Sequence, residues 1–220
     1  MSMNAIIDGL IGYLCLLVLL TFHEFAHAWT AWKCGDDTAY REGRVSLNPL
    51  VHMDLLGTVI LPLAVVFLSA ASSGLAGFIV GWGKPVPVDP SNLRNPRWHD
   101  TLIAMAGPAI NVALAALLMP FARLLFAGQQ PELASVVLLM AHISLLLCFF
   151  NLLPVPPLDG SHLVKNLTNM RDETYYRISQ YGLIIVIVLL QIPQVRFLIG
   201  FSTNMTFVAF AKLAGVPGIV

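Results

Sequence analysis

The sequence predicts an all-α protein that crosses a membrane several times. Hydrophobic residues make up 57% of its 220 residues and charged residues only 11%, whereas a soluble domain carries roughly 25% charged residues. The hydrophobic residues form long uncharged runs separated by short polar stretches. A chain with so little charge cannot cover a water-exposed surface, and a soluble globular domain is therefore excluded.

Charge and cysteine content exclude further classes of protein. The formal net charge is zero and no basic tract occurs, so we expect no nucleic-acid partner. Cys15, Cys34 and Cys148 are dispersed without a C-x-x-C pair, which argues against a disulfide framework and against a cysteine zinc site. We expect a single membrane domain over residues 1–220, because this length leaves little room for an additional soluble domain.

The first uncharged run, Gly9–Trp32, is interrupted by one charged residue, Glu24. At about 1.5 Å per residue, a helix over this run is roughly 36 Å long, enough to cross a hydrocarbon core of about 30 Å. Further uncharged runs follow along the chain. They are Leu55–Gly83, Thr101–Ala122, Leu133–Leu158, Ile178–Val195 and Phe197–Ala211.

The first run contains the motif H-E-x-x-H, as His23-Glu24-Phe25-Ala26-His27. Residues four apart share one face of a helix, so both imidazoles can bind one metal ion, with Glu24 beside them as a base for the attacking water. The alternative is two packed histidines and an incidental glutamate. Charged side chains inside a membrane are costly and mark function by default, which favours the metal site.

A catalytic zinc site usually has three protein ligands and one open position, and Asp159 is the candidate for the third ligand. It follows the run Leu133–Leu158 directly, after prolines at positions 154, 156 and 157. Prolines end a helix and leave carbonyls unpaired, which is tolerated at membrane depth only beside protein or water. The alternative is an N-cap for a helix over Ser161–Thr168, and from Asp159 alone this simpler role is favoured.

Taken together, these motifs resemble the site-2 protease family of intramembrane zinc metalloproteases. The resemblance rests on H-E-F-A-H in an early membrane helix and on N-x-x-P-x-x-x-L-D-G at residues 151–160. The stretches Ala106–Asn111 and Gly81–Val88 look like the same family. The resemblance covers about residues 10–170 and is greatest to compact prokaryotic members that lack PDZ or CBS domains.

The resemblance implies a zinc-dependent endopeptidase. It would hydrolyse peptide bonds in or near the transmembrane helices of other membrane proteins, in regulated intramembrane proteolysis. The implied site residues are the ligands of one catalytic Zn²⁺, His23, His27 and Asp159; the general base, Glu24; and two residues near the substrate, Asn111 and Asn151. Asparagines at membrane depth often serve only to link helices, which is the alternative for both. For Asn151 a functional role is favoured, because it lies two turns before Asp159.

The same resemblance places the chain in the cell membrane of a prokaryote as one metalloprotease domain. Its core would cover about residues 5–170 and its C-terminal helices residues 178–213. The competing interpretation is a membrane metal-ion transporter, which also places histidines and carboxylates in membrane helices. A transporter should repeat such residues along a path and often shows internal pseudo-symmetry; this chain concentrates them at one depth and shows no repeat.

The positions of the ligands constrain the topology. His23 lies near the C-terminal end of the first helix, and Asp159 lies just past the C-terminal end of the Leu133–Leu158 run. These two helices must run in the same direction for the ligands to meet, so one of the two intervening runs does not cross. Leu55–Gly83 is interrupted by Pro62 and a Ser/Gly stretch. We therefore predict about five membrane-crossing helices and a re-entrant Leu55–Gly83 segment.

The positive-inside rule supports this topology independently. With Lys212 near the C-terminus left out, it places nine basic residues on the face of the metal site and only two, Arg123 and Arg196, on the other. The site should therefore face the cytoplasm and the N-terminus the outside. If every run crossed, the same residues would divide six against five. The nine are Lys33, Arg41, Arg44, Lys84, Arg94, Arg97, Lys165, Arg171 and Arg177.

Other polar residues allow more than one interpretation. His52 and Asp54 could bind metal or substrate, although a loop hydrogen bond or a cap is favoured. His142 reads as a packed, hydrogen-bonded histidine. His162 is a possible spare ligand, but we leave it out because the fourth position is needed for water.

Two short stretches, Tyr40–Leu47 and Lys84–Val88, are β-prone and flanked by turns. Together they could form a small sheet at the cytoplasmic membrane edge, whose free edge would hold a substrate extended. Two structured loops are an equally good interpretation.

Overall fold

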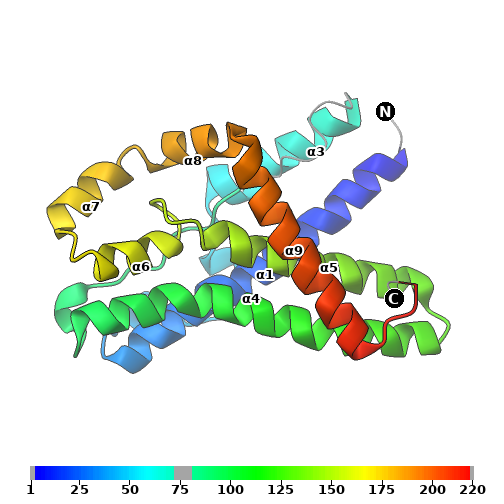
Figure 1. Ribbon diagram of the computed structural model, residues 1–220, viewed down its shortest axis with the longest axis horizontal. Helices are drawn as coiled ribbons and strands as arrows, with labels where there is room; N and C mark the ends of the chain where they lie inside the picture. The colour runs from blue at the N-terminus through cyan, green and yellow to red at the C-terminus, as the bar shows by residue number, and fades with distance from the viewer. Residues whose placement is uncertain (1–2, 72–80, 219–220) are drawn as a thin grey trace.

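The computed structural model describes residues 3–71 and 81–218, and this part of the chain is mainly helical (Figure 1). It contains no strand among the residues described, so the small sheet predicted from Tyr40–Leu47 and Lys84–Val88 is not confirmed. A π-helical turn (Leu55–Ile60) and short 3-10 turns (Pro49–Val51, Pro90–Asn92) connect the longer elements. The α-helices are α1 (Met3–Cys34), α2 (Thr38–Arg41), α3 (Leu61–Ala71), α4 (Pro96–Ala127), α5 (Pro131–Asn151), α6 (Gly160–Leu167), α7 (Asp172–Ser179), α8 (Gly182–Gln191) and α9 (Pro193–Ala214).

Within the described ranges, four helices are long and apolar enough to cross a membrane: α1, α4, α5 and α9. The protein is therefore a helical, multi-pass membrane protein. The expected count of about five crossings is not confirmed, because the run Ile178–Val195 contains only the ten-residue helix α8. Such a helix is about 15 Å long, half of what a crossing needs.

The ends of α4 and α5 follow from local sequence signals. Helix α4 begins earlier than its uncharged run, because Asn95 accepts a hydrogen bond from the amide of Trp98 and Pro96 occupies the first turn. Helix α5 ends at Asn151, ahead of three closely spaced prolines that cannot continue a helix.

The core of the bundle lies where α4, α5 and α9 meet (Figure 1). Alanines at positions 115, 141 and 211 are fully buried there, and such small side chains let membrane helices approach closely. At the same end of the bundle, Nη1 of Arg123 donates a hydrogen bond of 3.1 Å to the carbonyl of Ala214. This contact fixes the last turn of α9 beside the end of α4.

The other end of α9 lies beside the loop that leads to Asp159. Ile199, near the start of α9, is buried in a cluster with Leu153 and Leu158 of that loop. Arg196 was predicted on the membrane face opposite the metal site. That prediction is wrong, because α9 starts near the site and runs toward Arg123.

Residues at and beside the two ends of the predicted re-entrant segment contact each other. The amide of Trp82 donates to the carbonyl of Gly57 over 3.2 Å, and the amide of Lys84 donates to the carbonyl of His52 over 2.8 Å. Thr58 Oγ1 adds a hydrogen bond of 2.7 Å to the carbonyl of Trp82. By residue 82 the chain has therefore returned to the level at which it entered; residues 72–80 of the segment lie outside the described ranges.

The favoured interpretations of His52 and Asp54 are confirmed. His52 Nε2 lies 2.8 Å from the carbonyl of Ser46, as a loop hydrogen bond requires. Asp54 caps the following turn, where its Oδ1 accepts hydrogen bonds from the amides of Leu56 and Gly57.

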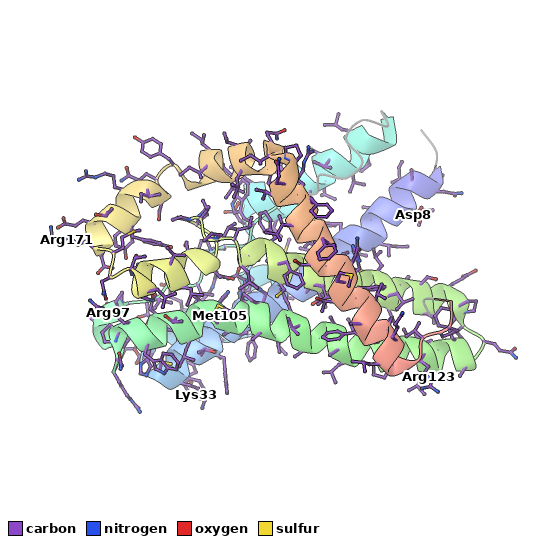
Figure 2. The ribbon with its side chains drawn as sticks, in the orientation of Figure 1. Asp8, Lys33, Arg97, Met105, Arg123 and Arg171 are labelled. Carbon is purple, nitrogen blue, oxygen red and sulfur yellow. The ribbon has the colours of Figure 1, made fainter. Side chains whose placement is uncertain are left out.

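Charged side chains lie toward the two ends of the bundle. Figure 2 places Lys33, Arg97 and Arg171 at one end, Asp8 and Arg123 toward the other, and Met105 between them. Helices α1 and α5 run in the same direction between these ends, and α4 runs in the opposite direction (Figure 1). The parallel arrangement of α1 and α5 that the ligands require is present.

A buried carboxylate holds the end of α1 against the loop before α4. Asp36 is 0% exposed and accepts hydrogen bonds from the amide and hydroxyl of Thr38, the amide of Asp89 and the side chain of Asn92. Burial raises the pKa of Asp36, but these hydrogen bonds outweigh that effect and hold the pKa below its usual value. Their contribution to stability is present above the pKa of the unfolded carboxyl and is lost as pH falls through the folded value.

We predict that Asp36→Ala lowers the free energy of unfolding by about 2–4 kcal/mol, because it leaves buried donors without a partner. The neighbouring Asp37→Ala is the control, since Asp37 is partly exposed and pairs with the exposed Arg41, a contact worth at most about 1 kcal/mol. Unfolding in detergent at neutral pH measures both variants. Equal losses in the two would contradict the assigned role of Asp36.

Candidate metal centre

The two histidines of the motif lie one turn apart on the buried face of α1. His23 is 3% exposed and His27 is 7% exposed, and their rings meet edge to face with centroids 4.7 Å apart. Glu24, between them in sequence, is less buried and lines a cavity of about 400 Å³. The helix therefore directs both imidazoles and the carboxylate to one site.

The atoms that could bind a metal form a small triangle. His23 Nε2 and His27 Nε2 are 3.1 Å apart. Asp159 Oδ2 lies 3.2 Å from His23 Nε2, and its Oδ1 lies 3.4 Å from His27 Nε2. Ligands at zinc-bond lengths of 2.0–2.1 Å in a tetrahedron are about 3.3 Å apart. Among the described residues, this is the one group of His, Cys, Asp or Glu side chains gathered for a metal.

Asp159 reaches this triangle because the chain after α5 is folded into tight turns. The amide of Val155 donates to the carbonyl of Leu153 over 2.8 Å, and that of Leu158 donates to Val155 over 3.0 Å. Gly160 follows immediately, and a side chain there would collide with the backbone of Leu152. The absence of a side chain at position 160 thus lets the loop close on itself and present the carboxylate to α1.

Asp159 does not cap α6 with its side chain, as the alternative interpretation required. Its side chain makes no capping hydrogen bond to α6. Its Oδ2 is buried and, within the described chain, has no hydrogen bond of acceptable geometry, although the ring nitrogen of His23 is close. A buried carboxylate that has an oxygen without a donor, and whose two oxygens each lie beside an imidazole nitrogen, fits a metal ligand.

Both imidazoles are oriented by the adjacent helix α4. His27 Nδ1 lies 2.7 Å from the carbonyl of Ile103, which can only accept, so Nδ1 carries the proton and Nε2 is free to bind a metal. Such a hydrogen bond on the far nitrogen is the usual support of a metal-binding histidine.

Asn111 supports His23 in a similar way. Its side chain is fully buried, with Nδ2 placed 3.1 Å from His23 Nδ1, and its Oδ1 is unpartnered within the described residues. Rotating the amide by 180° brings Oδ1 to the same place, where it accepts the Nδ1 proton of the metal-binding tautomer. The carbonyl of Asn111 in turn accepts a hydrogen bond of 2.8 Å from Ser144.

The two asparagines predicted near the substrate occupy different places. Asn151 lines the cavity and donates to the carbonyl of Leu147 over 3.0 Å. Asn111 lies behind His23 and does not line the cavity. A substrate contact by either residue stays a prediction, and the geometry favours it for Asn151.

Gly107 leaves the space in which a metal would sit. A Cβ at this position would lie 2.4 Å from His27 Nε2 and 2.7 Å from His23 Nε2. A side chain at position 107 would therefore occupy the position between the two nitrogens. The residues present fit a zinc ion in their donor set, their spacing and the space left for it.

Two other histidines lie outside the triangle. His162 lines the same cavity, but its Nδ1 lies 3.0 Å from Oδ1 of Asp100. His142 packs its ring edge against Phe207, with centroids 5.4 Å apart. Neither joins the candidate ligand group.

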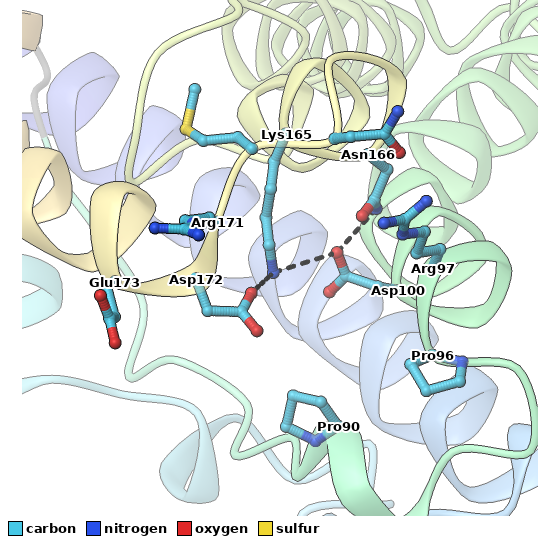
Figure 3. A pocket seen from close by; sticks show the side chains of 11 residues that line it. Pro90, Pro96, Arg97, Asp100, Lys165, Asn166, Arg171, Asp172 and Glu173 are labelled. Atoms are coloured by element: carbon cyan, nitrogen blue, oxygen red, sulfur yellow. Dashed lines mark hydrogen bonds and ion pairs between the residues drawn. The ribbon is translucent and has the colours of Figure 1, made fainter.

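Asp100 is a residue of the site that the sequence did not single out. It lines both the metal cavity and a second cavity of about 650 Å³ at the polar end of the bundle. In Figure 3 the ammonium of Lys165 lies between Asp100 and Asp172, at 3.8 and 2.8 Å. The sequence does show Asp100 as an acidic residue at the border of the uncharged run Thr101–Ala122. Its partner His162 is 62 positions away, so the sequence alone did not connect the two.

Comparison with known proteins decides the family. The profile of peptidase family M50 matches residues 11–133 and 126–193. The chain belongs to peptidase family M50. The resemblance to the site-2 proteases that its motifs indicated is thereby confirmed.

Its M50 relatives include bacterial proteins of similar or greater length. "Putative zinc metalloprotease YwhC" of Bacillus subtilis (strain 168) is 34% identical over 187 residues, which are 81% of this chain and 78% of that protein. "Putative zinc metalloprotease Rip2" of Mycobacterium tuberculosis (strain H37Rv) is 33% identical over 183 residues, which are 80% of this chain and 65% of that protein. No solved structure matches the chain significantly.

We predict that Gly107→Ala lowers the zinc affinity of this M50 family member by about 100-fold or more, because the methyl group intrudes between the two nitrogens, and changes in a supporting shell alone cost 10–100-fold. The control is Gly200→Ala on α9, where a Cβ meets no atom within 4 Å. Zinc content after dialysis against graded chelator measures both. Full zinc retention in Gly107→Ala would place the metal elsewhere.

Proposed function

We propose that the protein is a zinc-dependent intramembrane endopeptidase, which hydrolyses peptide bonds in or near the transmembrane helices of membrane protein substrates. The observation that carries the proposal is the triangle of His23, His27 and Asp159 beside Glu24, in a cavity of a multi-pass helical bundle. Membership of family M50 and the names of its bacterial relatives support the same activity. We assign one catalytic zinc ion to the triangle and regulated intramembrane proteolysis as its setting.

Each residue of the site has a distinct task. Zinc, when bound, polarises the scissile carbonyl and lowers the pKa of the attacking water. His23, His27 and Asp159 hold the ion, and the carboxylate offsets part of its charge. Glu24 accepts a proton from the attacking water and passes it to the leaving amine. The carbonyl of Ile103 keeps His27 in the tautomer that leaves Nε2 free.

The substrate has to be unwound before it can be cut, because a helix hides each carbonyl in its own hydrogen bonds. Gly83, Pro85, Val86 and Val88 line the metal cavity, and a Cβ at Gly83 would lie 3.0 Å from Oε1 of Glu24. Their backbone belongs to no helix or strand. We assign to this stretch the role of holding the substrate extended by backbone pairing.

Hydrolysis also requires water at membrane depth. Asp100 faces both the metal cavity and the larger cavity at the polar end of the bundle, and His162 of the metal cavity is bonded to it. Water can enter along these polar groups. This arrangement supports an active site open to the cytoplasm.

A metal-ion transporter is the less favoured function. In residues 3–71 and 81–218 the candidate metal ligands form a single group, whereas a transport path needs a succession of them. The family and the relatives are peptidases by name.

We predict that Glu24→Gln retains zinc and the fold but lowers cleavage of a model transmembrane substrate by at least about 100-fold, since removal of a general base costs 10²–10⁴-fold. Glu132→Gln, at the exposed far end of α5, is the matched control and should keep wild-type activity. Zinc stoichiometry and cleavage rate are measured on the same preparations. Wild-type cleavage by Glu24→Gln would remove this residue from the mechanism.

We propose that the protein lies in the cell membrane of a prokaryote, with its N-terminus outside, its metal site toward the cytoplasm and Leu55–Gly83 re-entrant. A cysteine at position 91, on the exposed turn after Asp89, should then react with an impermeant thiol reagent only from the cytoplasm. A cysteine at the exposed Gln130, between α4 and α5, should react only from outside. The native cysteines are buried and give little background. Labelling of both sites from one face would overturn this orientation.

A further inference from the structure

Arg44 is a buried arginine without an acidic partner. It is 2% exposed, and within residues 3–71 and 81–218 no carboxylate lies within 4.0 Å of its guanidinium. Burying an unpaired charge costs several kcal/mol unless other groups satisfy it. The groups that the guanidinium contacts should therefore indicate its role.

The guanidinium joins the two ends of the re-entrant segment. Nη1 donates to the carbonyl of Val51, just before the segment begins. Nη2 donates to the carbonyl of Lys84, just after the segment returns, and to the carbonyl of Pro85 over 3.1 Å. One side chain thus fixes residues that are more than thirty positions apart in sequence.

Arg44 is itself held by elements that lead directly from α1. Its amide donates to the carbonyl of Ala39 in α2 over 2.8 Å, and Ala39 is fully buried. The preceding Gly43 has a φ of +69°, a left-handed conformation that favours glycine. The guanidinium is therefore placed relative to the helix that carries His23 and Glu24.

Two of the three carbonyls that Arg44 binds, those of Lys84 and Pro85, belong to the segment that forms one wall of the metal cavity. Trp82, Gly83, Pro85 and Val86 line that cavity, and Gly83 is the residue that approaches Glu24. Lys84 lies between them, with its carbonyl on Arg44 and its amide on His52. Lys84 is thus held through both its amide and its carbonyl.

We propose that Arg44 is a positioning residue, which sets the register of the segment Gly81–Val88 relative to Glu24 and thereby selects the peptide bond that is cut. The inference rests on the proposed function, in which this segment holds the extended substrate. A shift of one residue along an extended segment turns every side chain and carbonyl to the other face. Arginine suits the task because its planar fork reaches several carbonyls at once, whereas a lysine presents a point charge.

The test compares Arg44→Met and Arg44→Lys with the control Arg41→Met, which alters an exposed arginine paired only with Asp37. We expect Arg44→Met to keep its zinc, because no zinc ligand contacts Arg44. Its kcat should fall by about 100-fold, as expected for a small misplacement of the reacting groups, with a smaller change in KM. Mass spectrometry should find cleavage at more than one bond, and Arg44→Lys should restore part of the rate.

Amide hydrogen exchange gives a measurement that does not depend on activity. Exchange at Trp82–Val88 should accelerate in Arg44→Met and stay at the wild-type rate in Arg41→Met. If Arg44→Met does not fold, Thr58→Val replaces it, because it removes the hydrogen bond from Thr58 to Trp82 in the same wall. The same change in exchange and in cleavage position is then expected.

The outcomes separate this inference from the proposed function. Cleavage by Arg44→Met at the single wild-type bond with wild-type kcat would overturn the positioning role, as would unchanged exchange at Trp82–Val88. A rate that falls without any change in cleavage position or exchange would also overturn it. If the wild type cleaves no helical substrate while exchange responds as expected, the proposed function fails and the placement of the wall by Arg44 stands.

Discussion

The meeting of three candidate metal ligands from distant parts of the chain is the constraint on which the rest of the structure depends. His23 and His27 come from the C-terminal half of α1, and Asp159 comes from the loop after α5. The two helices must run in the same direction to bring these ends together, so only one crossing, α4, can separate them. The segment that starts at Leu55 therefore has to return to its own side, as the contacts of Trp82 and Lys84 show that it does.

An apolar bundle makes polar groups costly, and here two polar groups beside the candidate ligands hold the imidazoles in place. Asn111 contacts His23, and its own carbonyl is held by Ser144 of α5. The carbonyl of Ile103 accepts from His27. These contacts tie α1, α4 and α5 together at the depth of the site, so the bonds that stabilise the bundle also preorganise the ligands.

The sequence predicted the parts that motifs and hydropathy specify. The sequence singled out the three residues that the structure gathers as candidate ligands. From spacing, charge and ligand depth it also predicted helices within the runs 9–32, 101–122 and 133–158 and the return of the segment after Leu55. The rotation of each helix could not be predicted, because a membrane helix is apolar on every side and has no stripe that marks the packed face. The contact of Asn111 with His23, the role of Asp100 and the direction of α9 depend on that rotation and on long-range packing.

The break in the chain after α5 explains why an aspartate so far along can serve as a ligand. Asp159 follows Asn151, the last residue of α5, by eight positions. In a continued helix it would lie about 12 Å beyond that residue, out of reach of His23. The prolines and the turns at Val155 and Leu158 fold this length back on itself, so both carboxylate oxygens face the imidazoles. The same turns leave part of the backbone lining the cavity, where protein and water can satisfy it. The departure from helix that would be unfavourable beside lipid is thus what brings a candidate ligand to the cavity.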